Sequence, residues 1–257
     1  PLCAEQMLYA ACFRVMAEIS KQLGKDGNVY RQEYEKLTAA IEKFFWDEEK
    51  GAYIDSFTSG KRNVTRHANI FAILFDIADK QKQEKILTNV LENDEIPAIT
   101  TPYFNFFELD VLCQMGKLTE VLDKIRSYWG GMLDLGAVTF WEEYDPSVPK
   151  EEQYDMYGDH FGKSLCHAWA ASPIYFLAKY FTGLDLVNKD GVTYVLKPQM
   201  QYFTDLDCTL PVGSDGTVRL AWDGECLEVT ADAEGGVLEL GEEKISLVRG
   251  ETRRVKI

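Results

Sequence analysis

The sequence has few basic residues and no long apolar run, and each absence excludes a class of partner. Its 42 acidic residues outnumber 27 basic ones, which gives a formal net charge of -15. Such a charge repels phosphate backbones and anionic lipid surfaces, so neither nucleic acid nor a membrane is an expected partner. No stretch of about 18 apolar residues is free of charge, which predicts no membrane-spanning helix. We expect a soluble protein, and the bacterial periplasm and cytoplasm both fit this pattern.

Signatures of disulfide, metal and nucleotide chemistry are missing as well. The six cysteines are scattered without a CxxC pair, which predicts free and mostly buried thiols rather than a disulfide framework. No HExxH string and no two-histidine spacing suggests a metal site. No GxGxxG or P-loop string opens an expected helix. The sequence therefore predicts neither a metal ion nor an organic cofactor.

Hydrophobic periodicity indicates helices over roughly the first 180 residues. With 257 residues, of which 46% are hydrophobic, the chain can bury one large core or two smaller ones. Segments that are apolar on nearly every side alternate with amphipathic ones, as inner and outer helices of a layered structure do. Pro173 predicts a kink or break near Ser172 in the last helix. The expected helices cover residues 4–23, 29–45, 65–79, 83–91, 103–115, 118–129 and 163–181.

Paired helices with buried inner members are typical of an α/α toroid, because each hairpin needs neighbours on both sides to cover its apolar face. A closed ring of six hairpins has twelve helices, and about seven are expected here. Beyond Gly183, short alternating runs separated by turn pairs such as Asp223-Gly224 predict antiparallel strands. The seven expected strands cover residues 192–196, 206–210, 218–222, 227–229, 237–240, 245–248 and 255–257. We therefore predict a mainly α chain with a C-terminal all-β domain: a partial (α/α)6 toroid in residues 1–184, then an antiparallel β-sandwich in residues 185–257.

The long segment from Gly130 to Gly162 is the strongest candidate for a functional site. Loops of about thirty residues are uncommon in compact domains and are usually functional or disordered. Its composition argues against disorder, because aromatic side chains alternate with carboxylates. Sugars bind to this mixture, since their C–H faces stack on aromatic rings while their hydroxyls need polar acceptors. The aromatic members are Trp141, Tyr144, Tyr154, Tyr157 and Phe161, and the acidic ones include Glu142, Glu143, Asp145, Asp155 and Asp159.

Three ordered strings make this region resemble a known family. They are YWGGM at residues 128–132, GAVTFWEEY at 136–144 and SLCHAWAASP at 164–173. Together they are similar to the C-terminal motifs of family 78 α-L-rhamnosidases, and the resemblance extends from the first helix pair to the trailing β-domain. It implies an inverting glycoside hydrolase that removes terminal rhamnose from glycans or glycosides.

The resemblance also implies roles for individual residues. The glutamate that follows the motif tryptophan activates the attacking water in that family, which assigns the catalytic base to Glu142. The histidine of the third string contacts rhamnose, which assigns substrate binding to His167, and Trp141 is expected to help wall the sugar site. Tyr103 is a further substrate-binding candidate, placed only by its position at the start of an expected inner helix.

The resemblance places the general acid of the reaction in an acidic segment of the first helical half, and no such segment precedes Pro1. Because inversion needs a carboxylic acid as well as a carboxylate base, we expect the isolated chain to be inactive. Inner helices without their neighbours would also expose apolar flanks, which predicts self-association through the truncated edge of the toroid.

Other interpretations of the same residues remain open. Glu142 and Glu143 are also compatible with solvated loop carboxylates, and His167 with a hydrogen-bonded core histidine. Trp129 and Trp169 are expected in the core. At the level of function, the alternatives are another α/α-toroid glycosidase and a non-catalytic carbohydrate-binding or structural fragment. A lyase acting on acidic sugars is disfavoured, because it needs basic groups to bind uronate carboxylates.

Overall fold

The computed structural model describes residues 1–189, 191–214 and 216–257. The chain forms two compact units, one made of residues 1–116 and 131–170 and the other of residues 117–130 and 171–257. Helices dominate the first unit, and two four-stranded sheets dominate the second. The predicted fold class, mainly α with a C-terminal β-domain, is confirmed. The expected domain boundary between residues 184 and 185 stays a prediction.

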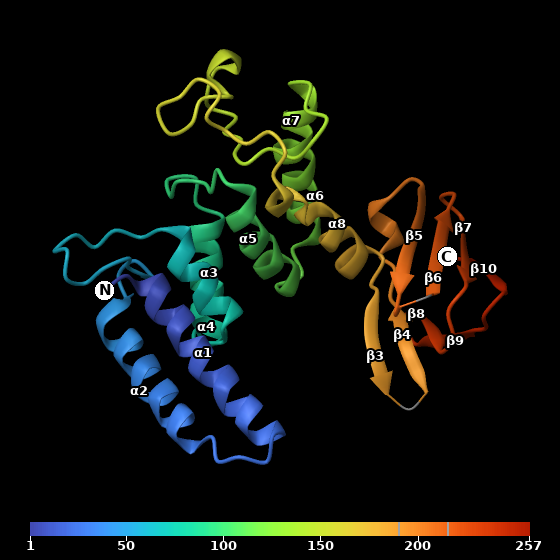
Figure 1. Cartoon of the computed structure of the whole chain (residues 1–257), viewed down its shortest axis with the longest axis horizontal. Coiled ribbons are helices and arrows are strands. Elements are labelled where there is room, and N and C mark those ends of the chain that lie inside the picture. Colours follow the sequence, from blue (N-terminus) through green and yellow to red (C-terminus); the bar gives the residue numbers. More distant parts are fainter. Residues whose placement is uncertain (190, 215) are drawn as a thin grey trace. The chain divides into compact units, whose positions relative to one another are not determined.

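In the first unit, inner and outer helices alternate along the chain. Helices α1, α3 and α5 contact one another in series, while α2 packs against α1 and α4 against α3 (Figure 1). This is the arrangement predicted for part of an α/α toroid. The elements are α1 (Cys3–Gln22), α2 (Asn28–Phe45), β1 (Trp46–Asp47), β2 (Ala52–Tyr53), α3 (Arg66–Leu74), α4 (Lys80–Ile86), the π-helical turn η1 (Leu87–Leu91), α5 (Pro102–Gln114), α7 (Gly130–Asp134, which begins in the second unit), and the 3-10 turns η3 (Lys150–Glu152) and η4 (Ala168–Ala170).

Two buried polar residues of α3 fix its neighbours. The Arg66 guanidinium forms an ion pair with Glu108 of α5, with an Nη1 to Oε1 distance of 3.0 Å, and both side chains are buried. Asn69 accepts a hydrogen bond from the backbone N–H of Tyr53 at 2.9 Å and donates one to the Tyr53 carbonyl at 3.0 Å. Because a buried polar group without a partner is costly, these contacts specify how α3 packs against α5 and β2.

Helix α3 ends earlier than its apolar pattern predicts. The pattern extends to Asp79, whereas the helix stops at Leu74 and Asp76 adopts a φ of 53°. Arg14 of α1 donates a hydrogen bond to the Phe75 carbonyl at 2.9 Å and forms an ion pair with Asp76 at 3.1 Å. The last carbonyl groups of a helix have no hydrogen-bond partner within the helix, and a nearby cation stabilises them. A contact from another helix therefore accompanies the early end of α3.

The single long helix predicted over residues 163–181 is wrong. Residues 163–167 are not helical, and a new helix, α8 (Ser172–Phe176), begins with Pro173 in its first turn. It continues as the π-helical turn η5 (Leu177–Phe181). Proline is well suited to the first turn of a helix, where its missing N–H has no intrahelical partner to lose. The break predicted near Ser172 is therefore confirmed, and Pro173 lies in the first turn of the helix that follows it.

The second unit contains the two sheets of the predicted sandwich. One sheet has the strand order β10-β7-β6-β5 and the other β3-β4-β8-β9. The β4–β8 pair is parallel, and the other pairs among the described strands are antiparallel. All seven predicted strand segments overlap observed strands, whereas β3 was missed. The elements are α6 (Leu118–Lys124), the π-helical turn η2 (Ile125–Trp129), α8, η5, β3 (Asp185–Lys189), β4 (Val192–Leu196), the 3-10 turn η6 (Met200–Tyr202), β5 (Leu206–Val212), β6 (Gly216–Trp222), β7 (Cys226–Ala231), β8 (Gly236–Leu240), β9 (Glu243–Leu247) and β10 (Thr252–Lys256).

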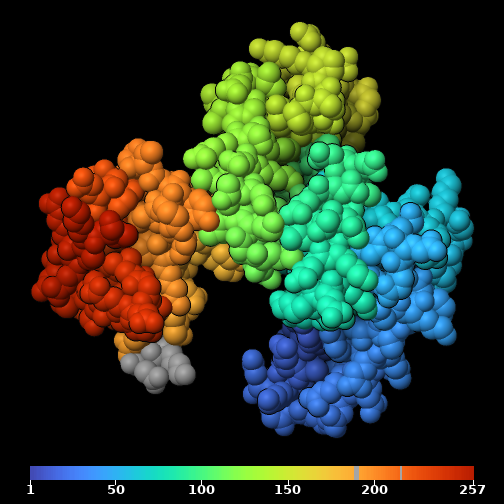
Figure 2. All heavy atoms as spheres, turned by 180° about the vertical axis from the view of Figure 1, so that it is seen from behind, coloured from blue at the N-terminus to red at the C-terminus, as the bar shows by residue number. Residues whose placement is uncertain are grey.

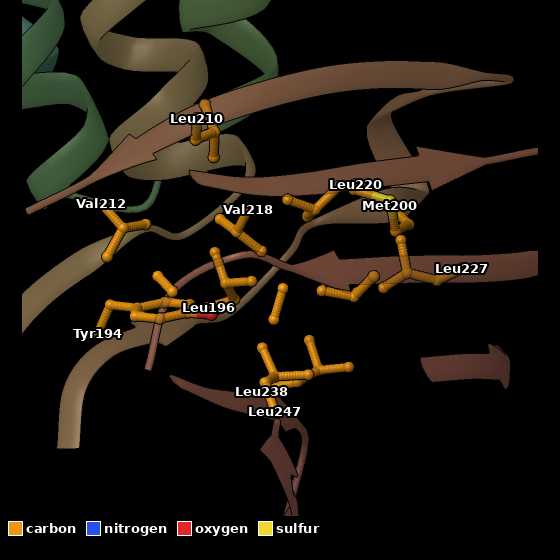
Figure 3. Packing of buried hydrophobic residues seen from close by; sticks show 13 residues of the cluster. Tyr194, Leu196, Met200, Leu210, Val212, Val218, Leu220, Leu227, Leu238 and Leu247 are labelled. Carbon is orange, nitrogen blue, oxygen red and sulfur yellow. The ribbon is translucent and has the colours of Figure 1, made fainter. Parts of the chain in front are cut away.

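The core of the second unit lies between its two sheets. Alternate residues of β7, Leu227, Val229 and Ala231, are buried, as a strand with one face covered requires. Side chains of both sheets meet in one cluster, in which Leu220 belongs to one sheet and Leu238 to the other (Figure 3). Burial of a large aliphatic side chain contributes about 1.5–3 kcal/mol, so this cluster stabilises the sandwich.

Two sequence predictions concerned the state of the cysteines and the absence of a membrane-spanning helix. All six cysteines are free thiols. Cys3 and Cys113 are buried, but Cys12 and Cys166 are exposed, so burial of the thiols was predicted too broadly. Among the helices that the structure describes, none is both long and apolar enough to cross a membrane.

Candidate active site

The loop that follows α7 brings the two motif residues Glu142 and His167 together. Its segments 139–142 and 164–167 run antiparallel, with the Glu142 N–H donating to the Ser164 carbonyl at 2.9 Å and the His167 N–H donating to the Phe140 carbonyl at 2.8 Å. The Thr139 hydroxyl also donates to the carbonyl of Leu165. Backbone hydrogen bonds therefore set the distance between the two side chains.

The Glu142 carboxylate is half-buried and is held at both oxygens. Oε2 accepts a hydrogen bond from the backbone N–H of Ser164 at 2.9 Å, and Oε1 accepts one from the hydroxyl of Tyr157 at 3.0 Å. The hydrogen bond from the Ser164 N–H lowers the pKa of Glu142 below its ordinary value, although partial burial opposes it. The Tyr157 hydroxyl and electrostatic interactions with His167 and Lys163 lower it further. The group is therefore a carboxylate near neutral pH, and each oxygen keeps a further lone pair with which to accept a proton or a hydrogen bond.

The neighbouring Glu143 has different partners. Its Oε1 accepts a hydrogen bond from the Thr100 hydroxyl at 2.9 Å, and its Oε2 lies 3.7 Å from the buried ammonium of Lys163. The Tyr144 N–H also donates to the Thr100 carbonyl at 3.1 Å. Glu143 therefore ties the loop to the segment before α5, whereas Glu142 is held within the loop itself. The two adjacent carboxylates therefore have different partners and different expected roles.

Buried polar contacts within the loop keep it compact. The Lys163 ammonium donates to the Gln153 carbonyl at 2.5 Å. The Gln153 side-chain amide, which is also buried, donates to the carbonyls of Asp145 at 2.6 Å and Val148 at 2.8 Å. In the space-filling view the yellow-green residues of this segment lie together as one lobe (Figure 2). These hydrogen bonds hold the loop in an ordered arrangement, as its composition predicts.

An exposed aromatic wall extends from His167 to the start of α5. Trp169 lies edge-on to the His167 ring at 6.0 Å and stacks on Tyr103 with a centroid distance of 4.8 Å and an interplanar angle of 29°. Trp169 is 66% exposed and Tyr103 is 45% exposed. The prediction that Trp169 lies in the core is therefore wrong. The stacked pair offers flat apolar surface of the kind on which the C–H faces of sugars pack.

Trp141 differs from these aromatic residues in its burial. It is 3% exposed and packs edge-on against Tyr154 at 5.5 Å. Its ring has little exposed surface in this chain, and its expected contact with the sugar stays a prediction. Trp129 is buried, as predicted.

Tyr157 lies in an unusual turn. Met156 and Asp159 exchange two backbone hydrogen bonds of 3.0 Å each, and the two residues between them have positive φ angles, 56° for Tyr157 and 86° for Gly158. This is the pattern of a type I′ turn, which favours Asn-Gly and similar pairs. A bulky residue in the left-handed region is a rare conformation that costs roughly 1–2 kcal/mol.

Three residues that shape this site were not predicted: Tyr157 as a partner of Glu142, Ser164 as a backbone donor, and Trp169 as an exposed ring. The Tyr157-Gly158 pair lacks the usual turn signature, and the contacts of Ser164 and Trp169 depend on distant segments. A glycine in the middle of a polar aromatic loop was the only available signal for the turn.

Two further observations concern cavities and metal ligands. An open cavity of about 770 Å³ in the second unit is lined by residues that include Trp222, Lys197 and Glu239, and none of the predicted site residues lines it. Within the described part of the chain, no group of three or more His, Cys, Asp or Glu side chains is arranged to hold a metal ion.

Comparison with known proteins identifies the family of this architecture. Residues 3–181 match the bacterial α-L-rhamnosidase six-hairpin glycosidase domain. A rhamnosidase from Klebsiella oxytoca with rhamnose bound is similar over 69% of this chain, with 29% identity and a TM-score of 0.60. A family 78 rhamnosidase from Bacillus sp. GL1 is similar over 94% of this chain, with 22% identity and a TM-score of 0.76.

A further structural relative is the Streptomyces avermitilis α-L-rhamnosidase complexed with L-rhamnose, with 16% identity over 91% of this chain and a TM-score of 0.65. Among curated proteins, none matches this sequence. The present chain covers 34% of the Klebsiella protein, 26% of the Bacillus protein and 22% of the Streptomyces protein. It therefore spans about a third or less of the length of each.

Proposed function

This chain belongs to the bacterial α-L-rhamnosidase six-hairpin glycosidase family, and on that premise we propose that its full-length protein removes terminal α-L-rhamnosyl residues from glycans or glycosides with inversion. The observation that carries the proposal is the Glu142 carboxylate, held at both oxygens by Ser164 and Tyr157. It lies in the same loop as His167, whose ring contacts the exposed aromatic wall of Trp169 and Tyr103, a combination suited to a base beside a sugar.

In the proposed mechanism, Glu142 takes a proton from water as that water attacks the anomeric carbon. His167 hydrogen-bonds to sugar hydroxyls, and Trp169 and Tyr103 stack on the apolar face of the ring. Inversion also needs a carboxylic acid, about 6.5–9.5 Å from the base, to protonate the departing oxygen. We propose that residues 1–184 are the C-terminal half of the toroid, that residues 185–257 are a separate β-sandwich domain, and that the acid lies in the first helical half.

The proposal is tested by assaying the full-length protein on a panel of aryl glycosides and on a uronic-acid polysaccharide. We expect the highest kcat/KM on the α-L-rhamnoside, with β-L-rhamnose as the first anomer seen by proton NMR. Faster turnover of another glycoside would support a different toroid glycosidase. Unsaturated products from the polysaccharide would support a lyase, and an initial α-anomer would contradict inversion.

A second proposal concerns the isolated chain, which we expect to bind rhamnose without hydrolysing it. Both exposed rings of the aromatic wall and the Glu142 carboxylate are present in this chain, whereas the general acid is proposed to lie elsewhere. Titration with rhamnose, followed by tryptophan fluorescence, is expected to show weak saturable binding with no release of aglycone from an aryl rhamnoside. Hydrolysis by this chain at a rate that Glu142→Gln abolishes would overturn the proposed location of the acid.

Self-association of the isolated chain is also expected, because α1 exposes an apolar stripe. Large hydrophobic side chains that are more than 40% exposed recur along the helix at positions that share one side. A patch of this kind marks a surface that another chain or segment covers. The exposed members within α1 are Leu8, Tyr9, Val15, Met16 and Ile19.

Sedimentation velocity checks this expectation. The isolated chain should form dimers or larger species at micromolar concentration, and Met16→Lys should shift it towards monomer because a charge is placed in the stripe. Glu18→Lys, on the same helix but at an exposed polar position, is the control for added positive charge and should leave the association unchanged. A chain that sediments as a monomer at all concentrations would contradict the prediction.

A further inference from the structure

We propose that Tyr157 is a positioning residue for Glu142: its hydroxyl, presented by a strained turn, fixes the orientation of the carboxylate that takes the proton from water. This inference rests on the proposed role of Glu142 as the base. It adds a residue whose contribution comes from a hydrogen bond to that base and not from contact with the sugar.

The first line of support is the geometry of the carboxylate. Its two oxygens accept hydrogen bonds from different segments of the loop, Oε2 from the Ser164 N–H at 2.9 Å and Oε1 from the Tyr157 hydroxyl at 3.0 Å. A carboxylate held at one oxygen can still rotate about its terminal bond, whereas one held at both oxygens cannot rotate without breaking a hydrogen bond. Only the Tyr157 contact comes from a side chain, so it can be removed by substitution.

The second line of support is the backbone of the turn. Tyr157 has a φ of 56° in a position where asparagine or glycine is favoured. Its ring is 78% exposed, so burial does not explain why a tyrosine is found there. Strained residues of this kind concentrate at functional sites, where the surrounding structure holds them in place. The Tyr157 hydroxyl donates a hydrogen bond to Glu142, and the shorter side chain of asparagine would not reach the same carboxylate from this position.

The groups around Glu142 determine how far its pKa should change when the Tyr157 hydroxyl is removed. Lys163 and His167 interact electrostatically with Glu142, and the carboxylates that act on Tyr157 are Glu142 first and Glu143 second. The shared hydrogen bond raises the pKa of the Tyr157 phenol and helps to lower that of Glu142. Without it, the Ser164 hydrogen bond and the interactions with Lys163 and His167 remain. The pKa of Glu142 should then rise towards its ordinary value without reaching it.

The direct test is a carbon-13 NMR titration of the glutamate side-chain carboxyls in this chain, with the Glu142 signal assigned by its loss in Glu142→Gln. Tyr157→Phe removes only the hydroxyl and is expected to move the Glu142 titration midpoint to higher pH. In the full-length protein the same variant should lower kcat roughly tenfold, the loss expected for a hydrogen bond to a charged group. The acid limb of its pH profile should move to higher pH, with KM little changed. An unaltered midpoint and an unaltered acid limb would overturn the proposal.

Tyr157→Asn separates positioning from a structural role. Asparagine suits the left-handed conformation, so this variant should unfold at the same or a higher temperature while it shows the same rise in the Glu142 midpoint. A lower unfolding temperature would mean that the tyrosine serves the stability of the turn, and the proposal would fail. If instead Glu142→Gln kept full activity, the proposed function would fail, a result independent of any Tyr157 variant.

Discussion

Glu142→Gln is expected to lower kcat of the full-length protein on an aryl α-L-rhamnoside by a factor of about 10² to 10⁴, the contribution typical of a general base. Glutamine has nearly the same shape as glutamate and keeps an oxygen that can accept a hydrogen bond from the Ser164 N–H. It cannot take a proton from water at neutral pH. Because the base acts mainly in the transition state, KM should change much less than kcat.

Glu143→Gln is the matched control, since it makes the same chemical change one residue further along. Glu143 contacts Thr100 and the buried Lys163, so the variant should lower the unfolding temperature while it keeps most of the activity. Initial rates and thermal melts of both variants separate the two effects. If Glu143→Gln lost more activity than Glu142→Gln, the assignment of the base would be reversed.

Arg66→Met is expected to cost about 3–5 kcal/mol of the free energy of unfolding, the loss typical when one member of a buried ion pair is removed. The variant leaves the Glu108 carboxylate buried in α5 without the guanidinium that lies 3.0 Å away in the native chain. It also removes the hydrogen bond from Arg66 to the Leu91 carbonyl at 2.9 Å. Urea titration of this chain, monitored by helical circular dichroism, measures the loss.

Two further variants bracket this result. Lys36→Met removes an exposed ion pair between Lys36 and Glu33 on α2 and should cost no more than about 0.5 kcal/mol. The double variant Arg66→Met with Glu108→Leu removes both buried charges and should recover part of the stability lost in the single variant. A single Arg66→Met variant as stable as Lys36→Met would show that the buried pair does not hold α3 against α5.

Much of the architecture could be predicted because it depends on local pattern. Apolar spacing located α1, α2 and α5 to within one or two residues, and Gly24, with a φ of 66°, follows the end of α1. Alternation of apolar residues found seven of the eight strands of the second unit. The failures depend on context: Pro173 starts a helix because the residues before it are held by other contacts, a condition that spacing does not encode.

Some residues of the candidate site could also be predicted from the sequence, and others could not. The motif strings indicated Glu142 and His167, and the structure brings both into one pair of antiparallel segments. The partners of Glu142 could not be predicted, because Tyr157 reaches it through a turn with atypical residues and Ser164 through its backbone. The exposure of Trp169 could not be predicted either, because it follows from the broken helix and from its stacking on Tyr103. Long-range contacts, and not residue type, decide these roles.

The most direct test of the central claim, that Glu142 directs a nucleophile to the anomeric carbon, is azide rescue of Glu142→Ala in the full-length protein. Azide can occupy the space left by the side chain and form a carbon–nitrogen bond as the glycosidic bond breaks, while the general acid protonates the departing oxygen. We predict restored turnover that yields β-L-rhamnosyl azide, identified by NMR. An α-configured azide, or a Glu142→Ala variant that hydrolyses the rhamnoside at the wild-type rate without azide, would contradict the account.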